Sequence, residues 1–242
     1  MEAKKTVKII FVIAAAAVLI FFLVLFFNSG NDSSQIKMAL DKETVNIANS
    51  EKQQSYTAVN LPTVNENDFI SGSKSAPVSI LIYEDYADYF SADFAVSLDK
   101  AKNDFGDKLN FVFRPFNVGG SELSNQAALS VRCAADYGQG DKWREKVFAA
   151  VRNHRLNVDD FLAWATEIGL NKEDFEKCLT NSEKKERIEE LMAQAENFSV
   201  FGAPTIFVGE EMIIGARPYE TFSDSNGDEI EGLKQFIERQ LN

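Results

Sequence analysis

A turn between a predicted strand and a predicted helix holds the residues of this chain that are best placed for chemistry. Residues 83–94 read YEDYADYFSADF, between the apolar run VSILIY (78–83) and the amphipathic run FAVSLDKAKNDF (94–105). A helix N-terminus offers unpaired N–H groups and the positive end of the helix dipole. The sequence puts a carboxylate, Asp88, and a hydroxyl, Ser91, at this place, where an anion is favoured.

The simplest interpretation of Asp88 is an N-cap, because Asp is among the best capping residues. Acid or base catalysis by Asp88 would need a partner, and the turn contains neither Cys nor His. The single histidine, His154, belongs to a distant predicted helix, where we expect an exposed helix-end residue. Tyr89 and Phe90 are either core residues or an exposed aromatic surface.

Cys133 and Cys178 are the only cysteines, 45 positions apart on two predicted helices. They do not form a Cys-x-x-Cys motif, and no histidine partner indicates a zinc site. Outside the cytoplasm an even pair is most simply a structural disulfide. Two buried free thiols, or a redox centre moved to this pair, remain as alternatives.

The elements around the turn predict a βαβ unit. Strands are expected at 78–83 and 108–116, with a helix at about 88–104 between them, so the two strands should be parallel. Helical patterns follow at 121–138, 141–154, 157–170, 171–181 and 182–198.

The chain then returns to strand patterns. Strands are predicted at 203–209 and 211–216, joined by a tight turn as a β-hairpin. A polar loop, SDSNGDE (223–229), and a closing helix at 229–241 complete the chain. The loop has acidic residues near a glycine, but it lacks the spacing and the distal Glu of a calcium loop, so we expect no metal.

The N-terminal region predicts a membrane anchor. Residues 9–27 are 19 uninterrupted apolar residues, enough to span a hydrocarbon core, and lysines precede them. We therefore expect residues 1–8 in the cytoplasm, a transmembrane anchor at 9–27, a polar linker at 28–68 and the rest outside. A cleaved signal peptide is less favoured because no small-x-small site follows, and a buried core helix would need a polar face.

The charge of the folded part excludes one class of partner. The formal net charge is −12, and residues 1–27 carry +2 from three lysines and Glu2, so the remainder carries −14. Such an acidic domain should not bind nucleic acid through a basic patch.

The order βαβ, helical block, ββα is that of a thioredoxin-like α/β fold with an all-helical insertion at about 121–198. Residues 61–242 resemble the DsbA family of extracytoplasmic thiol–disulfide oxidoreductases, in its membrane-anchored form. The resemblance is carried by SGSKSAPVSILIYEDY (71–86), FVFRPF (111–116) and, most specifically, FGAPTIFVGEEMIIGARPYETF (201–222). It implies a thioredoxin-like domain over residues 69–242.

The same resemblance identifies the main departure from the family. Aligning on EDY (84–86) and Phe94 puts Asp88 and Ser91 where the family has the two cysteines of its Cys-x-x-Cys motif. Disulfide exchange needs a thiolate to attack sulfur, which neither residue can supply.

Other features of the family are present. The resemblance implies a cis peptide bond at Ala203–Pro204 and a peptide-binding groove that includes Tyr89, Phe90, Ala203, Pro204 and Thr205. It favours partial exposure of Tyr89 and Phe90. It also agrees with a second, non-catalytic disulfide between Cys133 and Cys178.

We therefore expect a redox-inactive, membrane-anchored domain that faces outward and binds an extracytoplasmic protein or peptide, without cofactor. One alternative is an oxidoreductase that works in a non-standard way, with thiols supplied by a partner. Another is a purely structural domain whose groove is an unoccupied relic.

Overall fold

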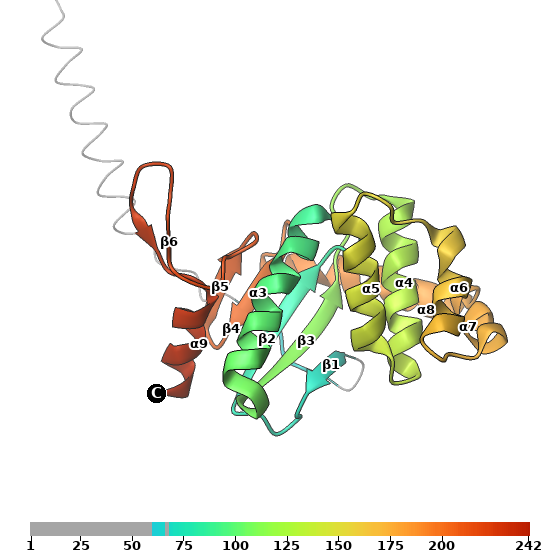
Figure 1. Ribbon diagram of the computed structural model, residues 1–242, viewed down its shortest axis with the longest axis horizontal. Coiled ribbons are helices and arrows are strands. Elements are labelled where there is room, and N and C mark those ends of the chain that lie inside the picture. Colours follow the sequence, from blue (N-terminus) through green and yellow to red (C-terminus); the bar gives the residue numbers. More distant parts are fainter. Residues whose placement is uncertain (1–59, 66–67) are drawn as a thin grey trace, which may run out of the picture. The chain divides into compact units, whose positions relative to one another are not determined.

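The computed structural model of the protein describes residues 60–65 and 68–242 (Figure 1). The predicted cytoplasmic segment (1–8), the predicted anchor (9–27) and most of the predicted linker lie outside these residues. Within the described ranges, no helix is long and apolar enough to cross a membrane.

A five-stranded sheet forms the centre of the domain, with the strand order β1-β3-β2-β4-β5. Its strands are β1 (Phe69–Gly72), β2 (Val78–Glu84), β3 (Leu109–Pro115), β4 (Thr205–Val208) and β5 (Glu211–Ile214). β2 and β3 are parallel, and α3 (Tyr89–Phe105) with the short η2 (Gly106–Lys108) connects them, which confirms the predicted βαβ unit. β4 pairs antiparallel with both β2 and β5.

Both faces of the sheet are covered, because successive side chains of β2 point to opposite faces and pack in two different apolar clusters. Ile80 and Ile82 pack in one apolar cluster with residues of α3 and of α9 (Leu233–Leu241), and these two helices cover the same face. Leu81 and Tyr83 belong to a second cluster on the opposite face, which includes Ala195 and Val200. Burial on both sides explains why this strand reads as a nearly continuous apolar run.

Helices fill the segment between β3 and β4, and they gather beside the sheet and α3 (Figure 1). They are α4 (Glu122–Asp136), α5 (Gly140–Arg152), η3 (Val158–Asp160), α6 (Phe161–Glu167), α7 (Lys172–Leu179), α8 (Ser182–Gln194) and η4 (Ala195–Phe198). Asn157, Asn171 and Asn181 cap three of them by accepting backbone N–H groups. The buried Trp143 contacts Phe161 and Phe175 in the core of this helical block.

The structure differs from the sequence-based expectation at four elements. β1 was not predicted, and it pairs antiparallel with β3 at one edge of the sheet. Two short strands, β6 (Phe222–Ser223) and β7 (Glu229–Ile230), bound the predicted polar loop. The closing helix α9 begins at Leu233 rather than at residue 229, because the chain around Glu229 is paired with β6.

Candidate functional site

The Asp88 turn, which we define as residues 85–91, leads from β2 into α3. The Asp88 carboxylate accepts a hydrogen bond of 2.7 Å from the backbone N–H of Ser91, and the Asp88 carbonyl accepts one from Ala92. The backbone of Asp88 is extended, as an N-cap requires. The predicted capping role of Asp88 is therefore confirmed.

Ser91 is buried in the first turn of α3, with 1% of its surface exposed. Its hydroxyl oxygen accepts a hydrogen bond of 3.1 Å from the backbone N–H of Asp85. The hydroxyl thus belongs to the internal hydrogen bonding of the turn. Neither it nor the Asp88 carboxylate can form a disulfide, so the turn offers an anion at the helix start without a thiol.

Tyr89 and Phe90 are 48% and 62% exposed, which decides between the two interpretations that the sequence left open. Their rings meet edge to face, with centroids 6.2 Å apart. They form an exposed aromatic surface at the first turn of α3, and they do not belong to the core.

His154 lies against this surface, although 65 residues separate it from Tyr89 in the sequence. Its ring stacks on Tyr89 with a centroid distance of 6.2 Å and an interplanar angle of 9°. It follows the end of α5 and has a positive φ of 52°. The prediction that His154 is exposed at a helix end is confirmed, but the sequence contained no signal that this end reaches the Asp88 turn.

The cis-proline loop, residues 201–204, leads into β4, and the Ala203–Pro204 peptide bond is cis as expected. The Pro204 carbonyl accepts a hydrogen bond of 2.8 Å from the N–H of Gly215, and the Thr205 hydroxyl donates one of 2.8 Å to the Gly202 carbonyl. Pro204 and Thr205 are buried and Ala203 is half-buried. Within the described residues, the backbone N–H and C=O of Ala203 have no hydrogen-bond partner.

The sheet register brings this loop to the Asp88 turn. Tyr83 of β2 is paired antiparallel with Thr205 of β4. Two residues beyond Tyr83 the chain reaches Asp85, and two residues before Thr205 it is at Ala203, so both segments leave the sheet at the same end. Phe201, which the sequence analysis did not single out, is 78% exposed in this loop.

The buried carboxylate of Asp85 holds the Asp88 turn in place through hydrogen bonds. Asp85 is 2% exposed, and its carboxylate accepts hydrogen bonds of 2.9 Å from the N–H groups of Ala87 and Val118. Burial raises the pKa of this carboxyl, and the two backbone hydrogen bonds oppose that rise.

A buried ion pair ties the end of β2 to the helical block. Arg144 of α5 donates two hydrogen bonds, of 2.7 and 2.6 Å, to the carboxylate of Glu84. Its guanidinium lies 4.1 Å from the ring centroid of Phe113 and 4.7 Å from that of Phe148. Phe148 also stacks on Tyr86 of the turn, and burial raises the pKa of that tyrosine well above its ordinary value.

The predicted disulfide between Cys133 and Cys178 is present, and it joins α4 to α7 with the two Cα atoms 5.9 Å apart. Both residues are buried in the core of the helical block. No cysteine therefore remains free in the chain.

Comparisons with known proteins agree with this fold. Residues 64–225 match the protein family described as Thioredoxin. The chain is 30% identical over 162 residues to a Na(+)/H(+) antiporter NhaA of Herminiimonas arsenicoxydans, a match that covers 66% of this chain and 25% of that protein. The chain thus spans about a quarter of the length of the curated relatives it matches.

Solved structures show the same fold at low sequence identity. BdbD from Bacillus subtilis, in its oxidised form, has a TM-score of 0.63 and 19% identity, over 76% of this chain and 98% of that one. The α-DsbA1 of Wolbachia pipientis has a TM-score of 0.57 and 18% identity, over 76% of this chain and 94% of that one. These structures share the fold, and the match over residues 64–225 shows that the chain belongs to the thioredoxin family.

Proposed function

We propose that this protein is a redox-inactive, membrane-anchored DsbA-like protein whose domain outside the cytoplasm binds an extended polypeptide without forming a covalent bond to it. One observation carries this proposal: the backbone of Ala203 has no hydrogen-bond partner among the described residues, and it lies beside an Asp88 turn that holds no thiol. An unpaired N–H and C=O at the end of a strand are what strand addition by an extended peptide uses.

The exposed aromatic rings supply the apolar part of this contact. Tyr89 and Phe90 lie at the start of α3, and Phe201 lies in the cis-proline loop at the same end of the sheet. Exposed apolar residues gathered near unpaired backbone groups support a binding surface. Asp88 adds negative charge, so the preferred peptide carries a Lys or Arg near the contact.

The anchor and the location rest on the sequence, through the apolar run 9–27 and the lysines before it. The likeness to part of an NhaA antiporter supports placing the domain at a membrane, since an antiporter is a membrane transport protein. A protein or peptide outside the cytoplasm is then the class of partner, and nucleic acid is disfavoured because the chain after residue 27 carries a net charge of −14.

The competing candidate is a thiol–disulfide oxidoreductase that takes its thiols from a partner. The position of residues 201–204 at the same end of the sheet as the Asp88 turn favours it, because the family resemblance implies that loop. Against it stands the location of Cys133 and Cys178, which are bonded to each other inside the helical block.

Calorimetric titration of the full chain in detergent micelles tests the proposed binding. The probe is an extended peptide of alternating Val and Thr with one Lys. Alanine at Tyr89 and Phe90 should weaken binding about threefold to tenfold, as expected for the loss of aromatic contacts. Tyr137→Ala is the matched control, because Tyr137 is also 48% exposed but lies at the end of α4. No binding, or equal weakening by the control, would refute the proposal.

A further inference from the structure

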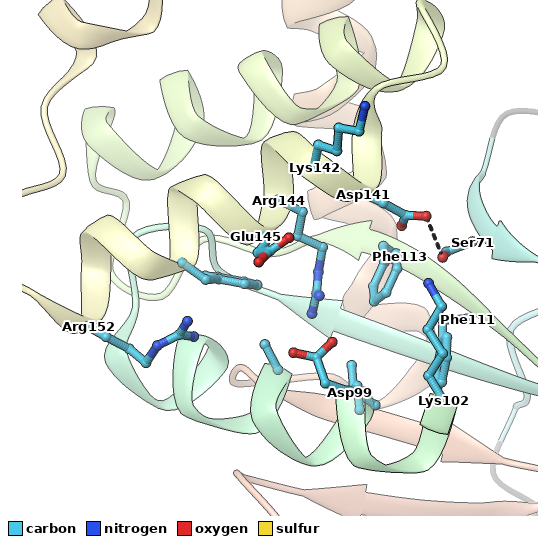
Figure 2. A pocket seen from close by; sticks show the side chains of 13 residues that line it. Ser71, Asp99, Lys102, Phe111, Phe113, Asp141, Lys142, Arg144, Glu145 and Arg152 are labelled. Atoms are coloured by element: carbon cyan, nitrogen blue, oxygen red, sulfur yellow. Dashed lines mark hydrogen bonds between the residues drawn. The ribbon is translucent and has the colours of Figure 1, made fainter. Parts of the chain in front are cut away.

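A charged cavity of about 140 Å³ lies between α3 and α5, over the aromatic side chains of β3 (Figure 2). Phe111 and Phe113 form its floor, and α3 contributes Leu98, Asp99 and Lys102 from its middle and last turns. The residues of the Asp88 turn and of the cis-proline loop do not line it. The cavity is therefore separate from the proposed peptide surface.

Arg144 gives this cavity a hydrogen-bond donor. The residue is 7% exposed, and its Nε and Nη2 atoms are held by Glu84. Its Nη1 forms no hydrogen bond to any residue of the described part of the chain, although the side chain lines the cavity. This atom is not among the buried side-chain atoms without a partner in the described residues, so it reaches the solvent of the cavity, where an acceptor that enters can meet it.

An acid faces this donor. Asp99 projects from α3 toward the guanidinium of Arg144 (Figure 2), yet it forms no ion pair within the described ranges. Asp141 is held by the hydroxyl of Ser71 at 2.8 Å, which leaves Asp99 as the acid that faces Arg144 across the cavity.

The charges around the cavity balance. Lys102, Lys142 and Arg152 line it beside Arg144, and the acids Asp99, Asp141 and Glu145 line it with Glu84 behind. With Glu84 counted behind the lining, four cations and four acids surround the cavity, and this balance does not favour a simple anion or a simple cation. It favours a neutral ligand that carries one charge of each sign.

We infer that the cavity binds a small zwitterion of the amino-acid class, with its carboxylate on Nη1 of Arg144 and its ammonium group on Asp99. The two ends of such a ligand are one carbon apart, which suits a donor and an acceptor that face each other across a gap. A single water occupies about 30 Å³ of liquid, so the cavity has room for more than one water but not for a drug-sized molecule.

Calorimetric titration of the full chain in detergent micelles with glycine and L-alanine tests this inference. Saturable binding is expected, while acetate and methylammonium, each with one of the two charges, should bind about tenfold more weakly or worse. Asp99→Asn should weaken the binding of L-alanine by about tenfold or more, for the same reason.

Asp93→Asn is the matched control, because Asp93 is an exposed acid on α3 that does not line the cavity. It should leave the affinity for L-alanine unchanged. Asp99 is itself exposed, so its replacement should not unfold the domain, and an unchanged unfolding midpoint of this variant checks that. No saturable binding of either amino acid, equal affinity for acetate, or full affinity in Asp99→Asn would overturn the inference.

Discussion

The carboxylate of Asp88 accepts a hydrogen bond of 2.7 Å from the backbone N–H of Ser91. These are the two positions at which the family resemblance places the cysteines of its redox motif. In this chain they are connected by a helix cap. The bond stabilises the start of α3 and leaves nothing at either position that can exchange a disulfide.

Replacing the cap should destabilise the domain. Asp88→Ala is expected to lower the free energy of unfolding by about 1 kcal/mol, because one orphan N–H of the helix loses its acceptor. Asp88→Asn should preserve most of that stability, since Asn caps about as well as Asp. Urea unfolding of the full chain measures both. Equal losses for Asn and Ala would show that the side-chain oxygen of Asp88 is not the stabilising group.

The wild-type protein should not catalyse disulfide formation, reduction or isomerisation. Its two cysteines are bonded inside the helical block, and Asp88 and Ser91 carry no sulfur. Standard dithiol and disulfide substrates measure this. Turnover that survives Cys133→Ala together with Cys178→Ala would contradict it.

Two cysteines introduced at the Asp88 turn should give the protein thiol–disulfide exchange activity. The variant with Asp88→Cys and Ser91→Cys is expected to gain thiol–disulfide exchange, because both positions lie at the N-terminus of α3, where a thiolate is stabilised. Ser91→Cys alone serves as its control, since a single buried thiol has no resolving partner.

Removing the structural disulfide should lower the stability of the domain and leave peptide binding at the Asp88 turn unchanged. Cys133 and Cys178 close a loop of 45 residues, for which the chain-entropy relation gives about 4 kcal/mol. Alanine at both positions should lower the free energy of unfolding by an amount of this order while peptide affinity at the turn persists. Two alkylatable thiols in the oxidised wild-type protein would contradict the pairing itself.

The titration of Asp85 should make the free energy of unfolding depend on pH. Burial raises the pKa of its carboxyl in the folded state above the ordinary value, so the folded protein binds this proton more tightly than the unfolded chain does. The contribution of Asp85 to stability is then largest below the ordinary carboxyl pKa, and it declines as pH rises through the raised folded value.

Carbon NMR of the Asp85 carboxyl, followed as a function of pH, checks this directly. A titration midpoint of Asp85 at or below the ordinary value of an aspartate carboxyl would contradict the burial argument.

Local sequence signals were enough to predict much of the fold. The parallel pair β2 and β3 followed from apolar runs around a helix, and the cap at Asp88 followed from its residue type. β1 was missed because four residues, FISG, are too few to show alternation, and their strand conformation depends on pairing with β3. The short strands β6 and β7 were missed for the same reason, since each has two residues.

The tertiary contacts of the site were the other part that the sequence could not provide. Two of these contacts are the stack of His154 on Tyr89 and the ion pair of Arg144 with Glu84. Each joins residues about sixty positions apart, and no sequence motif connects them. In the sequence, Glu84 has no feature that distinguishes it from an ordinary residue at the end of a strand. Its burial against Arg144 depends on how α5 packs on α3. The cavity beside Arg144 exists only because of that packing.

Hydrogen exchange of the Ala203 backbone amide, followed by NMR on the full chain in detergent micelles, tests the central claim most directly. Strand addition predicts that the extended Val/Thr peptide with one Lys slows exchange at Ala203, whose N–H has no partner within residues 60–65 and 68–242, while the amide of Tyr137 is unaffected. Unchanged exchange throughout residues 85–91 and 202–206 at saturating peptide would contradict the claim, and the working surface would then lie elsewhere on the domain.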